Sequence, residues 1–92
     1  MHERAPAFGG VDGRAYSVGT FVDEMPDAQG RYGAALLFVR WSDAGDRPVG
    51  HLETEYLASG ATPAEALAPL LALTVHELKQ HLDRCIERER RA

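Results

Sequence analysis

Alternating polar and apolar positions mark the first regular stretch of the chain. From Ala15 to Asp23 successive residues switch sides with a period of two, and β-branched and aromatic side chains are frequent. The segment 24–30 contains a proline, which stops a strand ladder, and ends in a glycine, which suits a positive φ. The pattern therefore predicts a first strand followed by a hairpin loop.

The next stretch, Tyr32 to Trp41, is apolar on both faces for most of its length. A short apolar run bounded by turn signals is typical of a strand that is covered on two sides, so we expect it in the middle of a sheet. After a second loop at 42–48, residues Val49 to Ala58 alternate again and predict a third strand. Its polar face carries His51, Glu53 and Glu55.

A helix start at Thr62 is the clearest local signal. The segment Thr62-Pro63-Ala64-Glu65 has the form of a capping box, with proline at the first helical position. Beyond it, apolar positions recur at intervals of three and four, at Leu67, Leu70, Leu71, Thr74, Leu78, Leu82 and Cys85. We expect one continuous amphipathic helix, bent near Pro69.

These elements predict a single α+β domain over residues 14–92. It has a three-stranded antiparallel sheet with one long C-terminal amphipathic helix packed on one face, and residues 1–13 form a flexible N-terminal arm. One helix covers only one face of a sheet, so the apolar second face of the middle strand needs another cover, for which a second copy of the chain is the simplest candidate. We therefore predict a homodimer or a higher oligomer, in which the dimer contacts are Leu37, Val39 and Trp41.

Charge and cysteine content narrow the classes of function. The 92 residues include 14 Asp and Glu and 10 Lys and Arg, a net charge of −4, and the whole acidic excess lies in residues 1–60. An acidic surface repels nucleic-acid phosphates and suits a basic protein partner, so we expect no direct binding of nucleic acid. The single cysteine, Cys85, cannot form an internal disulfide, and no apolar segment reaches the length of a membrane span. We expect a cytoplasmic protein that does not contact a membrane.

The sequence presents no set of acid, base and nucleophile typical of an enzyme. His76 and His81 lie five positions apart, which sets the two rings about 140° apart around a helix, too far to share a metal ion. A weaker alternative is a metal-dependent hydrolase built on His51, Glu53 and Glu55. We expect a non-catalytic protein with no cofactor and no bound metal.

The passage Leu57 to Leu67, in which a Ser-Gly-Ala step leads into Thr62-Pro63-Ala64-Glu65-Ala66, resembles the HicB-like antitoxin family. Proteins of that family carry a strand, a short glycine-containing step, a Thr-x-x-Glu-Ala helix start and an amphipathic helix. The hairpin Asp27 to Tyr32 is also similar to the family's acidic, glycine-containing first turn, and the likeness covers about residues 14–86. The chain departs from the family at 42–48, which has no Pro-Gly-Cys kink, and the sequence ends just after the predicted helix, so the resemblance does not imply DNA binding.

The resemblance implies a stand-alone domain similar to half of a ribonuclease H fold, without nuclease activity. Domains of this family dimerise through their sheets and cover a small basic toxin that cuts messenger RNA. We therefore expect an antitoxin-type, protein-binding module that dimerises and masks a small basic partner. The acidic residues expected to face this partner are Asp23, Glu24, Glu53 and Glu55. The alternative is a small structural or adaptor homodimer without a toxin partner.

Overall fold

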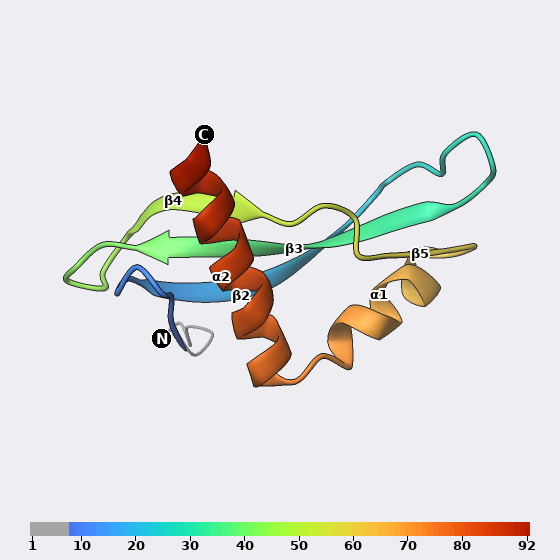
Figure 1. The fold of residues 1–92 in the computed structure, drawn as a ribbon. Helices are drawn as coiled ribbons and strands as arrows, with labels where there is room; N and C mark the ends of the chain where they lie inside the picture. Colours follow the sequence, from blue (N-terminus) through green and yellow to red (C-terminus); the bar gives the residue numbers. More distant parts are fainter. Residues whose placement is uncertain (1–7) are drawn as a thin grey trace.

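The computed structural model describes residues 8–92, which form an antiparallel sheet and two helices (Figure 1). The strands are β1 (Phe8–Gly9), β2 (Ala15–Val22), β3 (Tyr32–Trp41), β4 (Pro48–Glu53) and β5 (Ala58–Gly60), and the helices are α1 (Pro63–Leu71) and α2 (Val75–Arg91). The predicted α+β class with an antiparallel sheet and a C-terminal helix is confirmed. The predicted number of elements is wrong, because the sheet has more than three strands and the helix is divided in two.

β3 is the central strand, as its apolar sequence predicts. Along one edge it pairs with β2 in an unbroken antiparallel register, from Val22 opposite Ala34 to Tyr16 opposite Arg40. Along the other edge it pairs first with β4 and then with β5. β2, β4 and β5 therefore all pair directly with β3, and both edges of β3 are hydrogen-bonded to other strands.

The stretch predicted as one third strand is divided into β4 and β5 because Thr54 interrupts the ladder. The backbone N–H of Thr54 donates to the carbonyl of Leu36 at 3.0 Å. The N–H of Leu36, however, donates to the Thr54 hydroxyl oxygen, also at 3.0 Å, and not to a backbone carbonyl. The chain rejoins β3 at Leu57, whose N–H donates to the Ala34 carbonyl at 2.8 Å.

The predicted single helix is divided because a capping box starts a new helix at Thr74. The Thr74 hydroxyl accepts from the Glu77 N–H at 3.1 Å, and the Glu77 carboxylate accepts from the Thr74 N–H at 3.0 Å. Pro69 removes a backbone donor in the last turn of α1, so α1 ends at Leu71 instead of bending and continuing. No helix in residues 8–92 is long and apolar enough to cross a membrane.

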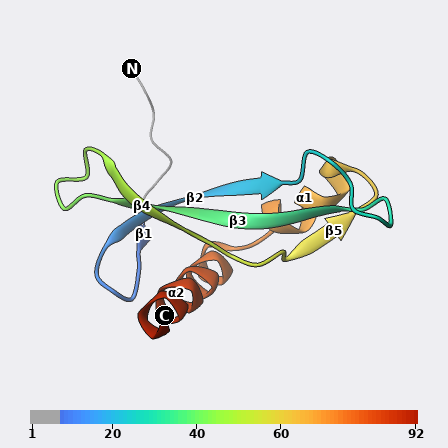
Figure 2. The ribbon, with the colours of Figure 1, turned by 90° about the horizontal axis from the view of Figure 1, so that it is seen from above.

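α2 lies to one side of the sheet (Figure 2). The buried residues of α1, Ala66 and Leu70, belong to the same core cluster as those of α2, so both helices cover the same face. Between the two layers is a core made of Tyr16, Ala34, Leu36, Phe38, Ala66, Leu70, Leu82, Cys85 and Ile86. Because side chains alternate along a strand, the other positions of β3 face the opposite side of the sheet. Within residues 8–92, no helix or strand covers that opposite side.

Residues 8–13, which the sequence assigns to the arm, take part in the fold. β1 pairs with the start of β2, and the Phe8 ring packs edge-on against Phe38 with the ring centroids 6.3 Å apart. The N–H of Val11 donates to the Asp83 carboxylate of α2 at 3.0 Å. The rest of the predicted arm, residues 1–7, lies outside the described residues.

Candidate protein-binding face

The side of the sheet opposite the helices carries an apolar row along β3. Leu37 and Val39 alternate with core residues, and Trp41 continues the row at the end of the strand. The Trp41 indole N–H fixes the ring by donating to the Ser17 hydroxyl oxygen of β2 at 3.0 Å. We call this surface the open face; its residues are Phe21, Leu37, Val39, Trp41, His51 and Glu53.

The neighbouring strands frame this row with small and polar side chains. Gly19 of β2 lies opposite Leu37, and Glu53 of β4 flanks Leu37 on its other side. Phe21 stands at the β2 edge with half of its surface exposed (50%). A shallow hollow over β3 and β4 is lined by Leu37, Val39, Pro48, Gly50, His51 and Glu53. Contiguous apolar surface with a polar rim is typical of a protein-interaction site.

Tyr56 closes one end of the open face. A Cβ atom added at Gly33 would come within 2.8 Å of the Tyr56 ring, so the ring lies directly over this glycine. The Tyr56 hydroxyl donates to Asp23 Oδ1 at 2.6 Å, and the Gly33 N–H donates to Asp23 Oδ2 at 3.1 Å. The hydrogen bond to Asp23 is the main reason that the pKa of Tyr56 is raised above its ordinary value. An aromatic side chain is thereby held on the surface beside the apolar row.

The structure does not gather the four predicted acidic residues in one place. Glu53 lies on the open face, with its carboxylate 3.7 Å from His51 Nε2. Asp23 binds Tyr56 and Gly33, so its carboxylate has a structural role at the end of the face. Glu24 is exposed in the hairpin loop that follows β2.

Glu55 lies outside the sheet, because β4 ends at Glu53. Its charge contributes to the raised pKa of the Cys85 thiol, which is caused first by burial of that thiol under the sheet. The polar strand face that was predicted to carry three residues therefore carries only His51 and Glu53. In the part of the chain that the structure describes, no three His, Cys, Asp or Glu side chains are arranged to hold a metal ion.

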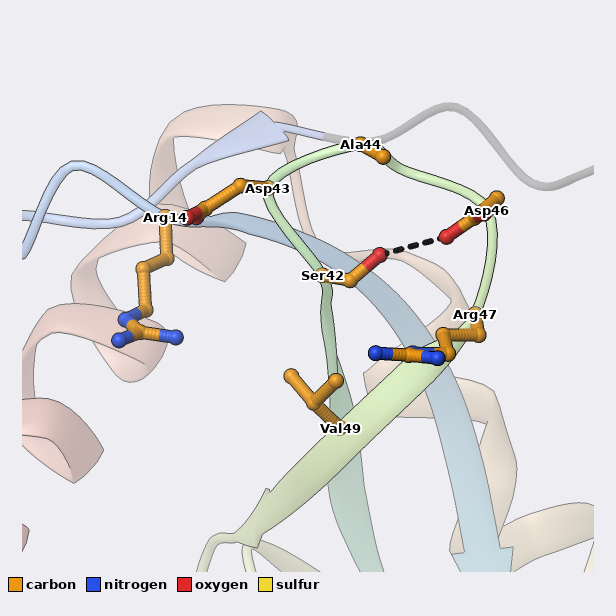
Figure 3. A pocket seen from close by; sticks show the side chains of 7 residues that line it. All are labelled: Arg14, Ser42, Asp43, Ala44, Asp46, Arg47 and Val49. Atoms are coloured by element: carbon orange, nitrogen blue, oxygen red, sulfur yellow. Dashed lines mark hydrogen bonds between the residues drawn. The ribbon is translucent and has the colours of Figure 1, made fainter.

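A pocket lies at the loop between β3 and β4 (Figure 3). The Ser42 hydroxyl donates to the Asp46 carboxylate at 2.8 Å. The other residues that line the pocket are Arg14, Asp43, Ala44, Arg47 and Val49. Two guanidinium groups and two carboxylates balance each other around it, so the lining gives no net field that would select a charged ligand.

A network of charged and hydrogen-bonded side chains around Arg40 lies on the helix side of the sheet. Arg40 contacts the Tyr16 hydroxyl, the Glu89 carboxylate of α2 and, at 3.9 Å, Asp12. Burial raises the pKa of Asp12, but the Arg14 N–H, the Tyr16 hydroxyl and the Arg40 charge together lower it below its ordinary value. These groups satisfy one another and tie α2 to the sheet, so their pKa shifts have a structural cause.

Comparisons of the chain with protein-family models, with curated proteins and with solved structures give no match. The resemblance to HicB-like antitoxins therefore stays a prediction from the sequence. The open face is the candidate site that the structure itself presents.

Proposed function

We propose that the chain is a non-catalytic protein-binding module of the antitoxin type, which forms a homodimer and covers a small basic partner with its open face. The apolar row on the uncovered side of the sheet carries this proposal. Leu37, Val39 and Trp41 stand in that row, and Phe21 extends it across β2. Burying such a row against a partner removes apolar surface from water, which is the main driving force of protein association.

Charge distribution favours a basic partner for the part of the chain that contains the sheet. Residues 8–74, which include the sheet and α1, contain nine acidic and four basic residues, whereas α2 contains four acidic and five basic residues. The acidic excess therefore belongs to the sheet and α1, and it attracts a basic protein during encounter and docking.

A second copy of the chain could occupy the open face instead of a basic partner. The sequence predicts this alternative, with Leu37, Val39 and Trp41 as the dimer contacts. The two possibilities differ in what a change on this face disrupts. Occupancy by a basic partner makes the face necessary for partner binding, whereas stacking of two copies makes it necessary for dimer formation.

Co-purification from the native host tests the proposal. We expect tagged wild-type protein to retain, in stoichiometric amount, a small basic protein that is released as the salt concentration rises. Val39→Asp places a charge in the middle of the apolar row and should abolish this retention. Val75→Asp is the matched control, because Val75 is 70% exposed at the start of α2, where an acidic side chain is tolerated by the helix dipole.

Two results would overturn the proposal. One is the absence of any basic protein that co-purifies in stoichiometric amount. The other is a basic protein that Val39→Asp and wild type retain equally, with circular dichroism showing that both are folded.

A further inference from the structure

The outer edge of β2 is mostly unpaired. β1 pairs with β2 only at Ala15 and Tyr16, and no other strand of residues 8–92 pairs with β2 on that edge. The sequence of β2, AYSVGTFV, contains no charged residue and no proline. Natural sheets protect exposed edges with charges, prolines or very short strands, and an edge without them is a template for another strand.

The other outer edges of the sheet carry these protections. β4 begins with Pro48 and contains His51 and Glu53, and β5 is only three residues long. β2 is therefore the edge strand that is least protected against pairing with another strand.

The hydrogen-bond pattern identifies the free backbone groups of β2. The N–H of Asp23 donates to the Gly33 carbonyl at 3.0 Å, and the register is unbroken from there along β2. Because residues in an antiparallel pair alternate between bonding inward and outward, Val18, Thr20 and Val22 direct their N–H and C=O groups away from β3. Three successive outward positions are enough to bond a short partner strand.

We propose that two copies of the chain join β2 to β2 in antiparallel orientation, with the two-fold axis at Thr20. This inference deepens the proposed function, since it rests on the homodimer and names its contact. The register pairs outward positions only with outward positions: Thr20 faces the partner's Thr20, and Val18 faces the partner's Val22. It uses residues 18–22 and leaves the pairing of β1 with Tyr16 undisturbed.

The side chains make this register self-complementary, which favours a second copy over an unrelated extended peptide. On the helix side, valine packs on valine, and threonine meets threonine at the axis. On the open face, Phe21 lies opposite the partner's Gly19, where an aromatic ring covers a glycine. No like charges come face to face, and a two-fold axis satisfies both copies at once.

This pairing has a direct consequence for partner binding. Because faces match across the joined strands, the two open faces lie on the same side of one continuous sheet. The apolar rows of both copies then form a single surface that remains free for a partner.

Cysteine cross-linking tests the axis. Opposed Cα atoms in such a pair lie about 5.5 Å apart, within the range for a disulfide, so mild oxidation of Thr20→Cys should convert most of the protein to a disulfide-linked dimer. Met25→Cys is the control: Met25 is 76% exposed but lies outside the paired stretch, and it should cross-link far less. Equal cross-linking of the two variants would overturn the inference.

Sedimentation velocity supplies a second readout that does not depend on disulfide geometry. Thr20→Lys places two like charges at the axis and should raise the dimer dissociation constant by about tenfold or more, while Val39→Asp should leave it unchanged. A dimer that Val39→Asp dissociates and Thr20→Lys does not would overturn the β2 contact and support face-to-face stacking. A wild-type protein that is monomeric at micromolar concentration would also overturn the β2 contact. The co-purification experiment would then still show whether the monomer binds a basic partner.

Discussion

The Tyr16 hydroxyl joins charged groups from three parts of the chain. It donates to Asp12 Oδ2 at 2.7 Å and accepts from Arg40 Nε at 2.7 Å, and Arg40 also binds Glu89 on α2. The Tyr16 ring itself is fully buried. Charged groups that lose a hydrogen-bond partner in a partly buried place are costly, so this hydroxyl should contribute more to stability than a surface hydroxyl does.

We expect Tyr16→Phe to lower the free energy of unfolding by about 2 kcal/mol, because two charge-assisted hydrogen bonds are lost while the packing of the ring is kept. Urea denaturation measures the effect. Tyr56→Phe is the matched control: its hydroxyl also binds a carboxylate, that of Asp23, but Tyr56 is 60% exposed, so its loss should cost clearly less than that of the Tyr16 hydroxyl. Equal losses in the two variants would contradict this ranking.

Asp12 should make part of the stability depend on pH. In the unfolded chain its carboxyl titrates near 3.8, and in the folded protein hydrogen bonds and Arg40 lower its pKa despite burial. The folded state therefore binds fewer protons, so this contribution is present above about pH 4 and is lost as the pH falls through the folded pKa. Urea unfolding of wild type and Asp12→Asn over an acid series should show the difference shrinking on acidification. A difference that stays constant with pH would contradict the assignment.

Local signals in the sequence predict some of these residues and not others. The Thr62 cap is predictable because its hydroxyl bonds the Glu65 N–H three positions away. The place of Tyr56 is not, because it depends on Gly33 and Asp23, which are distant in sequence. Alternation with His51, Glu53 and Glu55 would place Tyr56 on the opposite side of the sheet from them, but the ladder is interrupted at Thr54 and the Tyr56 ring lies over Gly33 instead.

Among the elements, α2 illustrates how one pattern can hide another. The segment Thr74-Val75-His76-Glu77 has the sequence form of a capping box, which is a sufficient signal for a new helix. The apolar spacing runs through it without a break, and Thr74 itself occupies a position in that spacing. Periodicity therefore predicts one long helix, whereas the cap and Pro69 together divide it.

Replacing Thr74 should weaken α2 as a unit. We expect Thr74→Ala to lower the free energy of unfolding by about 1 kcal/mol. The Glu77 N–H loses its acceptor, and the Glu77 carboxylate loses the hydrogen bond from the Thr74 hydroxyl. Thr74→Ser keeps the hydroxyl and should recover most of the loss. Thermal unfolding followed by circular dichroism distinguishes the two, and equal melting temperatures for Thr74→Ala and Thr74→Ser would contradict a capping role.

The strands divide in the same way into predictable and unpredictable parts. The hairpin between β2 and β3 follows from proline, glycine and alternation, all of which are local. The division between β4 and β5 follows from the Thr54 hydroxyl bonding to Leu36 across the sheet, which no local pattern encodes. Likewise, the end of β4 at Glu53 separates Glu55 from the face where alternation places it.

For the molecule as a whole, the two-sided apolar character of β3 is the most informative property of the sequence. It correctly predicts a central strand, and it leads to the expectation that one face needs a cover from outside the fold. The structure adds that both helices pack against one face of the sheet and that the alternate positions of β3, on the other face, form the apolar row. The apolar row and the free edge of β2 exist only once the sheet is assembled. The sequence alone therefore does not predict which molecule covers the row or whether two copies join at β2.

Fluorescence of Trp41, the single tryptophan, provides the most direct test of the open face. We expect its emission to shift to shorter wavelength as the purified basic partner is added and to saturate at stoichiometric amount, because Trp41 passes from partial exposure to a dry interface. Trp41→Phe supplies the background from the partner. Self-association of the chain without partner should leave the emission unchanged. A partner that binds without shifting the emission of Trp41 would contradict the proposal that the open face is its binding surface.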